Sequence, residues 1–313
     1  MWYRPGTVGI DGNRGAPLRT TERLRRMVEE PGLAFLMEAH SGLSAKVVEE
    51  AGFEGIWASG FSIAAALGVR DANEASWTQV LEVVEFMTDA TSLPILIDGD
   101  TGYGNFNSVR RLVRKLEQRG VAGVCIEDKT FPKTNSLRRG AVHPLADVDE
   151  FAGRIKAGKD AQADDAFVVV ARVEALVAGR GLPEALRRAE AYRAAGADAI
   201  LVHSTQADAG EVIAFKKEWA DRGPVVIIPT TYHAAGTDVF RRHGFSVVVW
   251  ANHLMRASLC AMQAAAAQIF ASDGVAGVEA EIAPIAEVFR IQGQAELDQA
   301  EARYLPHPPR PPR

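Results

Sequence analysis

Few cysteines and no run of basic residues limit what this chain of 313 residues can be. Two cysteines are too few for a disulfide framework or a zinc site. Cys125 lies in an apolar run and Cys260 in an alanine-rich helical pattern, so we expect both in the core. The net charge of -5 and a pI near 5.9 provide no positive field, which argues against nucleic acid as a partner.

The chain also lacks the signals of export and membrane insertion. Its first residues show no charged start, apolar stretch and cleavage site, and the most apolar helical segment, 257–271, is interrupted by Gln263 and Gln268. We therefore expect a cytoplasmic protein without membrane contact. Nucleotide binding is not indicated, because Gly102-Tyr-Gly104 lacks a third glycine and no phosphate-binding loop occurs; a serine-hydrolase elbow is missing too.

Eight short runs rich in Val, Ile and Leu recur along the chain, each ending in polar residues and separated from the next by a helical pattern. Continuous apolar strands with helices between them indicate a parallel sheet covered by helices. Eight such units favour an α/β fold of the TIM type, a closed (β/α)8 barrel, over an open sheet. The runs are 33–39, 55–60, 94–100, 123–128, 167–174, 199–204, 224–230 and 246–253.

The same pattern divides the chain into four parts. We expect a polar leader at 1–20, the barrel at 21–271, a helical extension at 272–305 and a proline-rich, mobile tail at 306–313. The helix at 255–271 is expected to complete the barrel. Helices beyond a closed barrel need another surface to pack against, so we expect the extension to contact a second subunit.

Acidic residues gather where the third and fourth runs end, and in such a barrel these strand ends form the active site. Asp98 and Asp100 are two residues apart, so they would share one face of a strand. With Glu127 and Asp71 they form an oxygen-only set, which suits Mg²⁺ or Mn²⁺ better than zinc. The alternative is that one aspartate only caps a turn. Glu127 and Asp128 are adjacent, so only one of them is expected to face inward.

Two basic side chains belong to the same ring of strand ends. Arg172 lies within an apolar run, where a buried charge needs an anion. Glu174 on the same face would be that anion in a structural ion pair, and a phosphoryl or carboxylate group of a substrate is the other candidate. His203 ends the sixth run, and its neighbour Arg172 favours substrate binding over a structural role. We interpret His253 as structural.

These residues stand in longer segments by which the chain resembles the phosphoenolpyruvate mutase/isocitrate lyase superfamily. The similarity covers nearly all of residues 33–305. It runs through GIWASG at 55–60, GVRDANEASW at 68–77, DGDTGYGNFN at 98–107, EDKTFPKTNS at 127–136, ARVEA at 171–175 and WANH at 250–253. The resemblance implies a barrel whose eighth helix is exchanged between subunits, in a homodimer or homotetramer.

The resemblance also implies roles for individual residues. For the metal, Asp98 would be the most direct Mg²⁺ ligand, with Asp71, Asp100 and Glu127 holding its waters. For the substrate, Trp57, Ser59, Gly60 and Phe61 would bind the pyruvate part. Arg172 and His203 would bind the phosphoryl group, and Lys133 and Asn135, in a gating loop at 133–137, would close over it. Catalysis would then rest on Asp71, Lys133, Asn135, Arg172 and His203.

The reaction implied is migration of a phosphoryl group between the enol oxygen of phosphoenolpyruvate and C3 of phosphonopyruvate, as in phosphonate biosynthesis. Lyases of the superfamily, acting on substrates such as methylisocitrate or oxaloacetate, carry a cysteine in the loop, and residues 129–140 contain none. Phosphonopyruvate hydrolases usually read Lys-Asp-Thr where this chain reads Lys-Thr-Asn at 133–135. Gly99 and Thr130 depart from the mutase pattern, so the hydrolase remains an alternative; a non-catalytic scaffold would have no use for the acids and the loop together.

Overall fold

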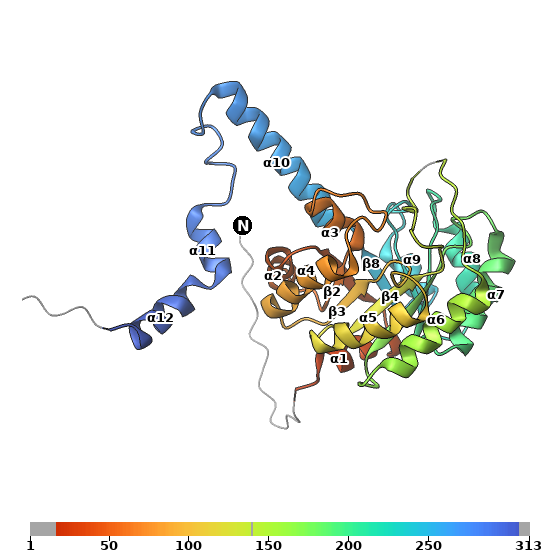
Figure 1. Ribbon diagram of the computed structural model, residues 1–313. Coiled ribbons are helices and arrows are strands. Elements are labelled where there is room, and N and C mark those ends of the chain that lie inside the picture. The colour runs from red at the N-terminus through yellow and green to blue at the C-terminus, as the bar shows by residue number, and fades with distance from the viewer. Residues whose placement is uncertain (1–16, 139, 307–313) are drawn as a thin grey trace, which may run out of the picture.

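The computed structural model describes residues 17–138 and 140–306, and its core is a closed barrel of eight parallel strands (Figure 1). Each strand pairs with the next along the chain, and β8 pairs with β1. The strands are β1 (Ala34–Ala39), β2 (Gly55–Ala58), β3 (Ile95–Asp98), β4 (Gly123–Glu127), β5 (Val168–Val173), β6 (Ala199–Val202), β7 (Val225–Ile227) and β8 (Val247–Trp250). The predicted barrel is therefore confirmed. Apart from β1, which ends as predicted at Ala39, each strand ends one to three residues earlier than predicted, because the last residues of the run belong to the following turn or helix.

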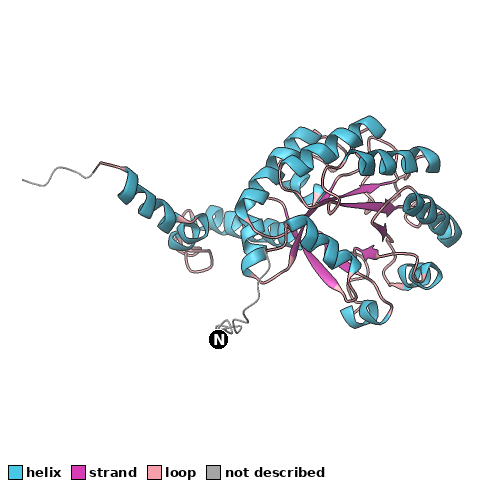
Figure 2. Cartoon of the chain, turned by 90° about the horizontal axis from the view of Figure 1, so that it is seen from below, coloured by secondary structure: helices cyan, strands magenta, loops and turns pink. Residues whose placement is uncertain are grey.

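Helices cover the outside of the barrel, as Figure 2 shows in a view turned by 90°. They are α2 (Gly42–Glu50), α3 (Gly60–Ala66), α4 (Trp77–Ala90), α5 (Phe106–Gln118), α6 (Val148–Ala161), α7 (Gly181–Ala194), α8 (Gly210–Trp219) and α9 (Thr237–Arg242). The predicted capping box before α4 is present, since the Ser76 side chain accepts from the N–H of Gln79 and its own N–H donates to the Gln79 side chain.

Two apolar cores hold this arrangement together. The larger lies between the sheet and the helices that cover it, and the smaller fills the inside of the barrel. Helix α1 (Thr20–Glu29) contributes Leu24 and Val28, both almost fully buried, to the inner core. The N-terminal side of the barrel is thereby filled with apolar side chains, which leaves the opposite ends of the strands for polar groups.

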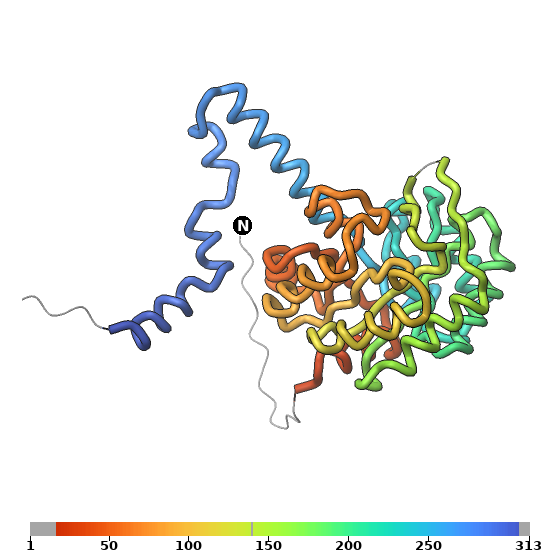
Figure 3. The backbone as a smooth tube through the Cα atoms, in the orientation of Figure 1, coloured from red at the N-terminus to blue at the C-terminus, as the bar shows by residue number. Residues whose placement is uncertain are grey.

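The C-terminal helices contradict one expectation, that the helix at 255–271 completes the barrel of its own chain. Helix α10 (His253–Ser272) begins in contact with β1. It then runs away from the barrel and is followed by α11 (Ile285–Gln292) and α12 (Gln294–Tyr304), the blue end of the tube in Figure 3. The first turn of α10 is held by Glu38, whose buried carboxylate accepts hydrogen bonds from the N–H groups of Leu254 and Met255. Met255 is its buried residue, so the helix does not complete the barrel of its own chain.

Two further expectations concern the cysteines and the ends of the chain. Cys260 is exposed on α10 and not in the core, because the helix has left the barrel at that point; Cys125 is buried as expected. Residues 1–16 of the expected leader and 307–313 of the expected tail lie outside the described residues. Among the residues that are described, no helix combines the length and apolar character needed to cross a membrane.

Candidate active site

A small cavity of about 50 Å³ lies at the C-terminal ends of the strands. It brings together residues that the sequence predicted for metal, pyruvate and phosphoryl binding, from Trp57 on β2 to His203 after β6. Its lining consists of Trp57, Ser59, Phe61, Asp71, Asp98, Glu127, Lys133, Asn135, Ser136, Leu137, Arg172, His203, Ile228, Thr230, Ala251 and Asn252. Of the predicted site residues, Gly60 and Asp100 lie just behind this lining.

Asp98 and Asp100 converge, but not for the predicted reason. Strand β3 ends at Asp98, and Asp100 sits in the following turn with a φ of +51°, a left-handed conformation. The backbone N–H of Asp100 donates to Oδ1 of Asp98 at 3.2 Å. A tight turn therefore brings the two carboxylates together, and strand alternation does not. Gly60 allows this crowding, because a Cβ there would lie 3.1 Å from Oδ1 of Asp100.

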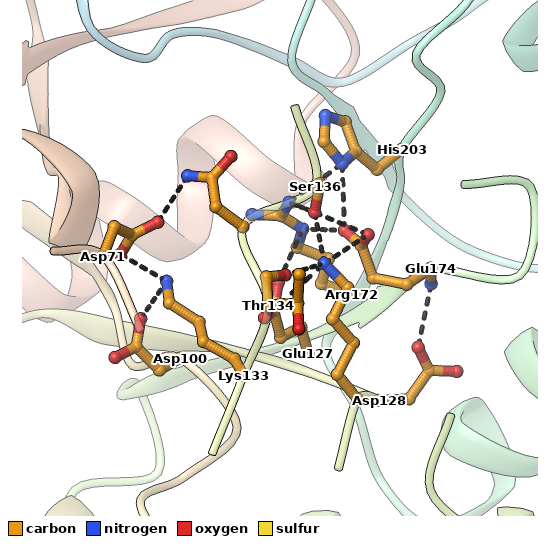
Figure 4. A network of polar contacts seen from close by, with 12 residues as sticks. Asp71, Asp100, Glu127, Asp128, Lys133, Thr134, Ser136, Arg172, Glu174 and His203 are labelled. Carbon is orange, nitrogen blue, oxygen red and sulfur yellow. Dashed lines mark hydrogen bonds and ion pairs between the residues drawn. The ribbon is translucent and has the colours of Figure 1, made fainter. Parts of the chain in front are cut away.

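The loop between α3 and α4 adds a third acid, Asp71, which meets the segment 133–137. The Nζ atom of Lys133 lies 2.8 Å from Oδ1 of Asp71 and also forms an ion pair with Asp100 (Figure 4). The Asn135 side chain donates to Oδ2 of Asp71 at 2.5 Å. We call the segment 133–137 the lid, and Asp71, Asp98, Asp100 and Glu127 the acidic half of the site.

Charges in the acidic half are strongly coupled. Burial raises the pKa of Asp98, and it raises that of Asp100 to about 7. Burial also opposes ionisation of Asp71, but the ammonium of Lys133 and the lid hydrogen bonds lower its pKa below the ordinary value. Burial alone would lower the pKa of Lys133, whereas the surrounding acids raise it well above the usual range. These carboxylates thus require a cation, and the Lys133 ammonium serves as one.

The acidic half also has the donor chemistry of a magnesium site. Its oxygen atoms are the hard ligands that Mg²⁺ prefers, and Oε1 of Glu127 is buried without a hydrogen-bond partner. Within residues 17–138 and 140–306, no group of three or more His, Cys, Asp or Glu side chains converges as direct ligands. The residues therefore fit an ion held by few direct carboxylates and several waters, which is common for Mg²⁺.

Arg172 and His203 form the opposite wall, which we call the basic half. Nε of Arg172 lies 2.5 Å from Oε1 of Glu174 and 3.4 Å from Oε2 of Glu127, so the structural ion pair left open by the sequence is present. Nη2 lies 2.8 Å from Nδ1 of His203 and 3.1 Å from Oγ of Ser136. The hydrogen bonds of Arg172 to the described residues run from Nε and Nη2. Arg172 thus has an internal anion and still lines the cavity.

His203 is held in a fixed position at the end of β6. Its Nδ1 atom lies 2.9 Å from Oε1 of Glu174 as well as close to Arg172. Burial and the charge of Arg172 lower the pKa of His203, while Glu174 opposes the change. At neutral pH the imidazole is therefore uncharged, and the positive charge of this wall comes from Arg172.

Ser136 and Lys129 are residues whose part in the site the sequence did not reveal. The Ser136 hydroxyl donates to Oε2 of Glu174 at 2.7 Å and accepts from both Arg172 and Lys129. Lys129 is almost fully buried, donates to the carbonyl of Thr134 at 2.9 Å and lies 3.1 Å from Glu174. A lysine inside the buried run after β4 was an available signal, but its partners are distant in sequence.

Asp128 points away from the cavity, as expected for the neighbour of Glu127. Its carboxylate accepts from the hydroxyl of Tyr192 at 2.8 Å, from Nη1 of Arg188 at 3.0 Å and from the backbone N–H of Glu174 at 2.8 Å. It therefore ties the ends of β4 and β5 to α7. Ser59 has a local role too, since its Oγ accepts from the N–H of Ser62 at the start of α3.

Taken together, the barrel and the acid-lined cavity at its strand ends define a (β/α)8-barrel enzyme. A family model described as phosphoenolpyruvate phosphomutase matches residues 24–270. A phosphoenolpyruvate phosphomutase from Tetrahymena pyriformis is 58% identical over 92% of this chain and 96% of its own length. The chain belongs to the phosphoenolpyruvate phosphomutase family.

Solved structures give the same result. The crystal structure of phosphoenolpyruvate phosphomutase from Streptomyces platensis subsp. rosaceus superposes with a TM-score of 0.89 at 43% identity, covering 92% of this chain and all of that one. Phosphonopyruvate hydrolase in complex with oxalate and Mg²⁺ has a TM-score of 0.87 at 39% identity, with the same coverage. The predicted family and fold are thus confirmed, and a relative of the chain binds magnesium.

Proposed function

We propose that this protein is a Mg²⁺-dependent phosphoenolpyruvate phosphomutase, which interconverts phosphoenolpyruvate and phosphonopyruvate. The observation that carries the proposal is the pairing, in one cavity, of an acidic half with a basic half under a lid whose Lys133 and Asn135 reach Asp71. The reaction needs these two environments side by side, one for the pyruvate part and one for the phosphoryl group.

In the acidic half, Asp98 would be the direct ligand of Mg²⁺, and Asp71, Asp100 and Glu127 would hold its waters. When bound, the ion would supply positive charge for the carboxylate and enolate oxygen of the pyruvate part. Trp57, Ser59, Gly60 and Phe61, at the end of β2 and the start of α3, would bind and orient the same part of the substrate. The orphaned Oε1 of Glu127 supports a role in holding water.

In the basic half, Arg172 would bind the phosphoryl oxygens through the part of its guanidinium that the protein leaves free. A phosphoryl group in transfer is loosely bonded and spreads negative charge over its oxygens, so fixed donors stabilise it. Glu174 holds Nε of Arg172, and His203 lies against Nη2. Arg172 and His203 are therefore fixed in place and need not reorganise when the phosphoryl group leaves the enol oxygen and moves to C3.

The lid would retain the phosphoryl group. Water in the cavity would capture it and yield pyruvate and phosphate, so the mutase must exclude water. Asn135 is neutral and cannot activate water as a base, and it closes the cavity by its hydrogen bond to Asp71. Lys133 is nearly fully buried in the same position. These contacts favour the mutase over the hydrolase.

Assembly and the division of the chain are further parts of the proposal. The apolar side chains exposed on α10, among them Leu259, Met262 and Phe270, suit the predicted exchange of this helix with a second copy in a dimer or tetramer. The predicted boundary between 21–271 and 272–305 falls at the end of α10, so the exchanged helix would belong to the barrel part and the extension would begin after it. A cytoplasmic location stays a prediction.

The test is ³¹P NMR of the purified protein with Mg²⁺ and phosphonopyruvate. A phosphoenolpyruvate resonance that depends on Mg²⁺ is the expected result. Phosphate and pyruvate as the products would make the protein a phosphonopyruvate hydrolase, the second candidate, which Thr130 favours and for which the departure of Gly99 from the mutase pattern leaves room. An unchanged spectrum would refute both. A lyase is disfavoured because neither cysteine lines the described cavity.

A further inference from the structure

Asn73 lies between the lid and the acidic half, in the loop that joins α3 to α4. Its φ is +58°, a left-handed conformation that asparagine adopts more readily than most residues. Its side-chain oxygen accepts the backbone N–H of Lys133 at 2.7 Å, and its side-chain nitrogen donates to Oδ2 of Asp100 at 2.7 Å. One amide group therefore joins the lid backbone to a carboxylate of the site.

This contact differs in kind from the other contacts between the lid and the acidic half. Lys133 reaches Asp71 and Asp100 through its ammonium, and Asn135 reaches Asp71 through its amide. A metal ion would compete for those carboxylates, and an anionic substrate would compete for the ammonium and the amide that reach them. The bond from Asn73 uses a backbone N–H of the lid, so it does not compete with either.

The second bond of Asn73 limits how Asp100 can turn. With Oδ2 held by Asn73, Oδ1 is the oxygen that faces the Lys133 ammonium. An Asn side chain offers one acceptor and two donors in a fixed arrangement, so both bonds form together only when the lid is closed. Lid closure and the orientation of Asp100 are thereby linked through a single side chain.

We propose that Asn73 is a positioning residue that holds the lid closed and, through the same amide, orients Asp100. The inference rests on the proposed function for its catalytic consequence, but the hydrogen bonds themselves can be measured without turnover. Loss of Asn73 opens the lid more often, which exposes the Lys133 amide to solvent and lowers the rate of the reaction.

Two substitutions separate the two bonds. Asn73→Gly removes both and keeps the left-handed backbone, which glycine adopts without strain. Asn73→Asp keeps the acceptor for Lys133 but places a like charge against Asp100 where the donor was. Asp273→Gly is the matched control, because Asp273 has a φ of +49° at the end of α10 and lies away from the lid.

The first measurement is hydrogen exchange of the Lys133 amide, followed by NMR in the protein without Mg²⁺ or substrate. Exchange should be about fivefold faster in Asn73→Gly, the effect of losing one net hydrogen bond. It should stay near the wild-type rate in Asn73→Asp and Asp273→Gly. The Thr130 amide, bonded to the carbonyl of Pro144 at the base of the lid, should be unchanged throughout.

The second measurement is turnover of phosphonopyruvate. We expect kcat to fall about fivefold or more in both Asn73 variants and to be unchanged in Asp273→Gly. Unchanged Lys133 exchange in Asn73→Gly, or wild-type kcat in Asn73→Asp, would overturn the proposal. If the wild-type protein makes no phosphoenolpyruvate, the proposed function fails, while the Lys133 exchange rates still decide the role of Asn73 in the lid.

Discussion

The two halves of the site neutralise their charge from different parts of the fold. In the acidic half, the cation beside Asp71 and Asp100 is Lys133, which comes from the lid. In the basic half, the anion beside Arg172 is Glu174, two residues further along the same chain segment at the end of β5. A counter-charge on a loop can be exchanged for another cation, whereas one that follows the same strand stays. The counter-charge of the acidic half can therefore be replaced when the lid moves, whereas the counter-charge of the basic half stays in place.

The largest effect should come from removing charge in the acidic half. Asp98→Asn keeps the shape of the side chain but removes the proposed direct ligand, so kcat/KM should fall about 10³-fold. The assay is the ³¹P NMR rate at increasing Mg²⁺. Asp128→Asn is the control, since Asp128 faces α7 and its loss should lower stability without changing the Mg²⁺ dependence. Near wild-type turnover of Asp98→Asn would show that Asp98 is not the ligand of a catalytic metal ion in this half.

A substitution in the basic half tests whether the fixed ion pair of Arg172 with Glu174 supports substrate binding or only the stability of the fold. Arg172→Lys keeps the charge beside Glu174 but loses the planar fork, so kcat/KM should fall about 10²-fold. Steady-state kinetics and thermal unfolding of the same sample separate the two roles. Lower stability with unchanged kinetics would mean that Arg172 acts only as the partner of Glu174.

The lid, which connects the two halves, should give a smaller effect on rate and a change in products. Asn135→Ala removes the bond to Asp71, so kcat should fall about tenfold while the share of phosphate and pyruvate rises, as water enters. The ratio of phosphate to phosphoenolpyruvate in ³¹P NMR measures this share. Arg138→Ala alters an exposed residue next to the lid and should leave the ratio unchanged; an equal ratio in both variants would contradict the retention role.

The smallest effect concerns pH. The pKa of His203 is lower in the folded protein than its ordinary value of 6.5, so the unfolded chain takes up the proton first as pH falls. The stabilisation is therefore complete above pH 6.5 and is lost below it. The midpoint of thermal unfolding should fall between pH 7 and 5, and less steeply in His203→Gln. Parallel slopes for the two proteins would assign the acid sensitivity to other groups.

Much of this arrangement could be predicted from the sequence, because it follows from local pattern. Eight apolar runs ended by polar residues indicate a barrel, and the strand ends identify Asp98, Glu127, Arg172 and His203. The left-handed turn at Asp100 and the bonds of Asn73, Ser136 and Lys129 could not be predicted. Their partners lie on other loops and strands, and no periodicity connects Ser136 to Glu174.

The path of α10 marks a different limit. Its apolar pattern predicts a helix against a surface and suggested the barrel of the same chain, whereas the family resemblance implied exchange with a second subunit. The structure holds only the first turn there, through Glu38, and leaves Cys260 exposed. The apolar pattern of a helix indicates that one of its faces is covered, but it does not say whether the same chain or a second copy of the chain covers it.

Glu127 ends β4 and Asp128 follows it directly, and the first side chain lines the cavity while the second contacts α7. The pairing of Glu127 with Arg172 across β4 and β5 sets which acid enters the cavity. A shift of β4 by one residue would reverse every side chain and put the anchor of α7 where the site carboxylate belongs. Insertion or deletion of a single residue in this strand would therefore abolish activity although every functional side chain is still present in the sequence. The register of β4 determines activity as much as the identity of its residues does.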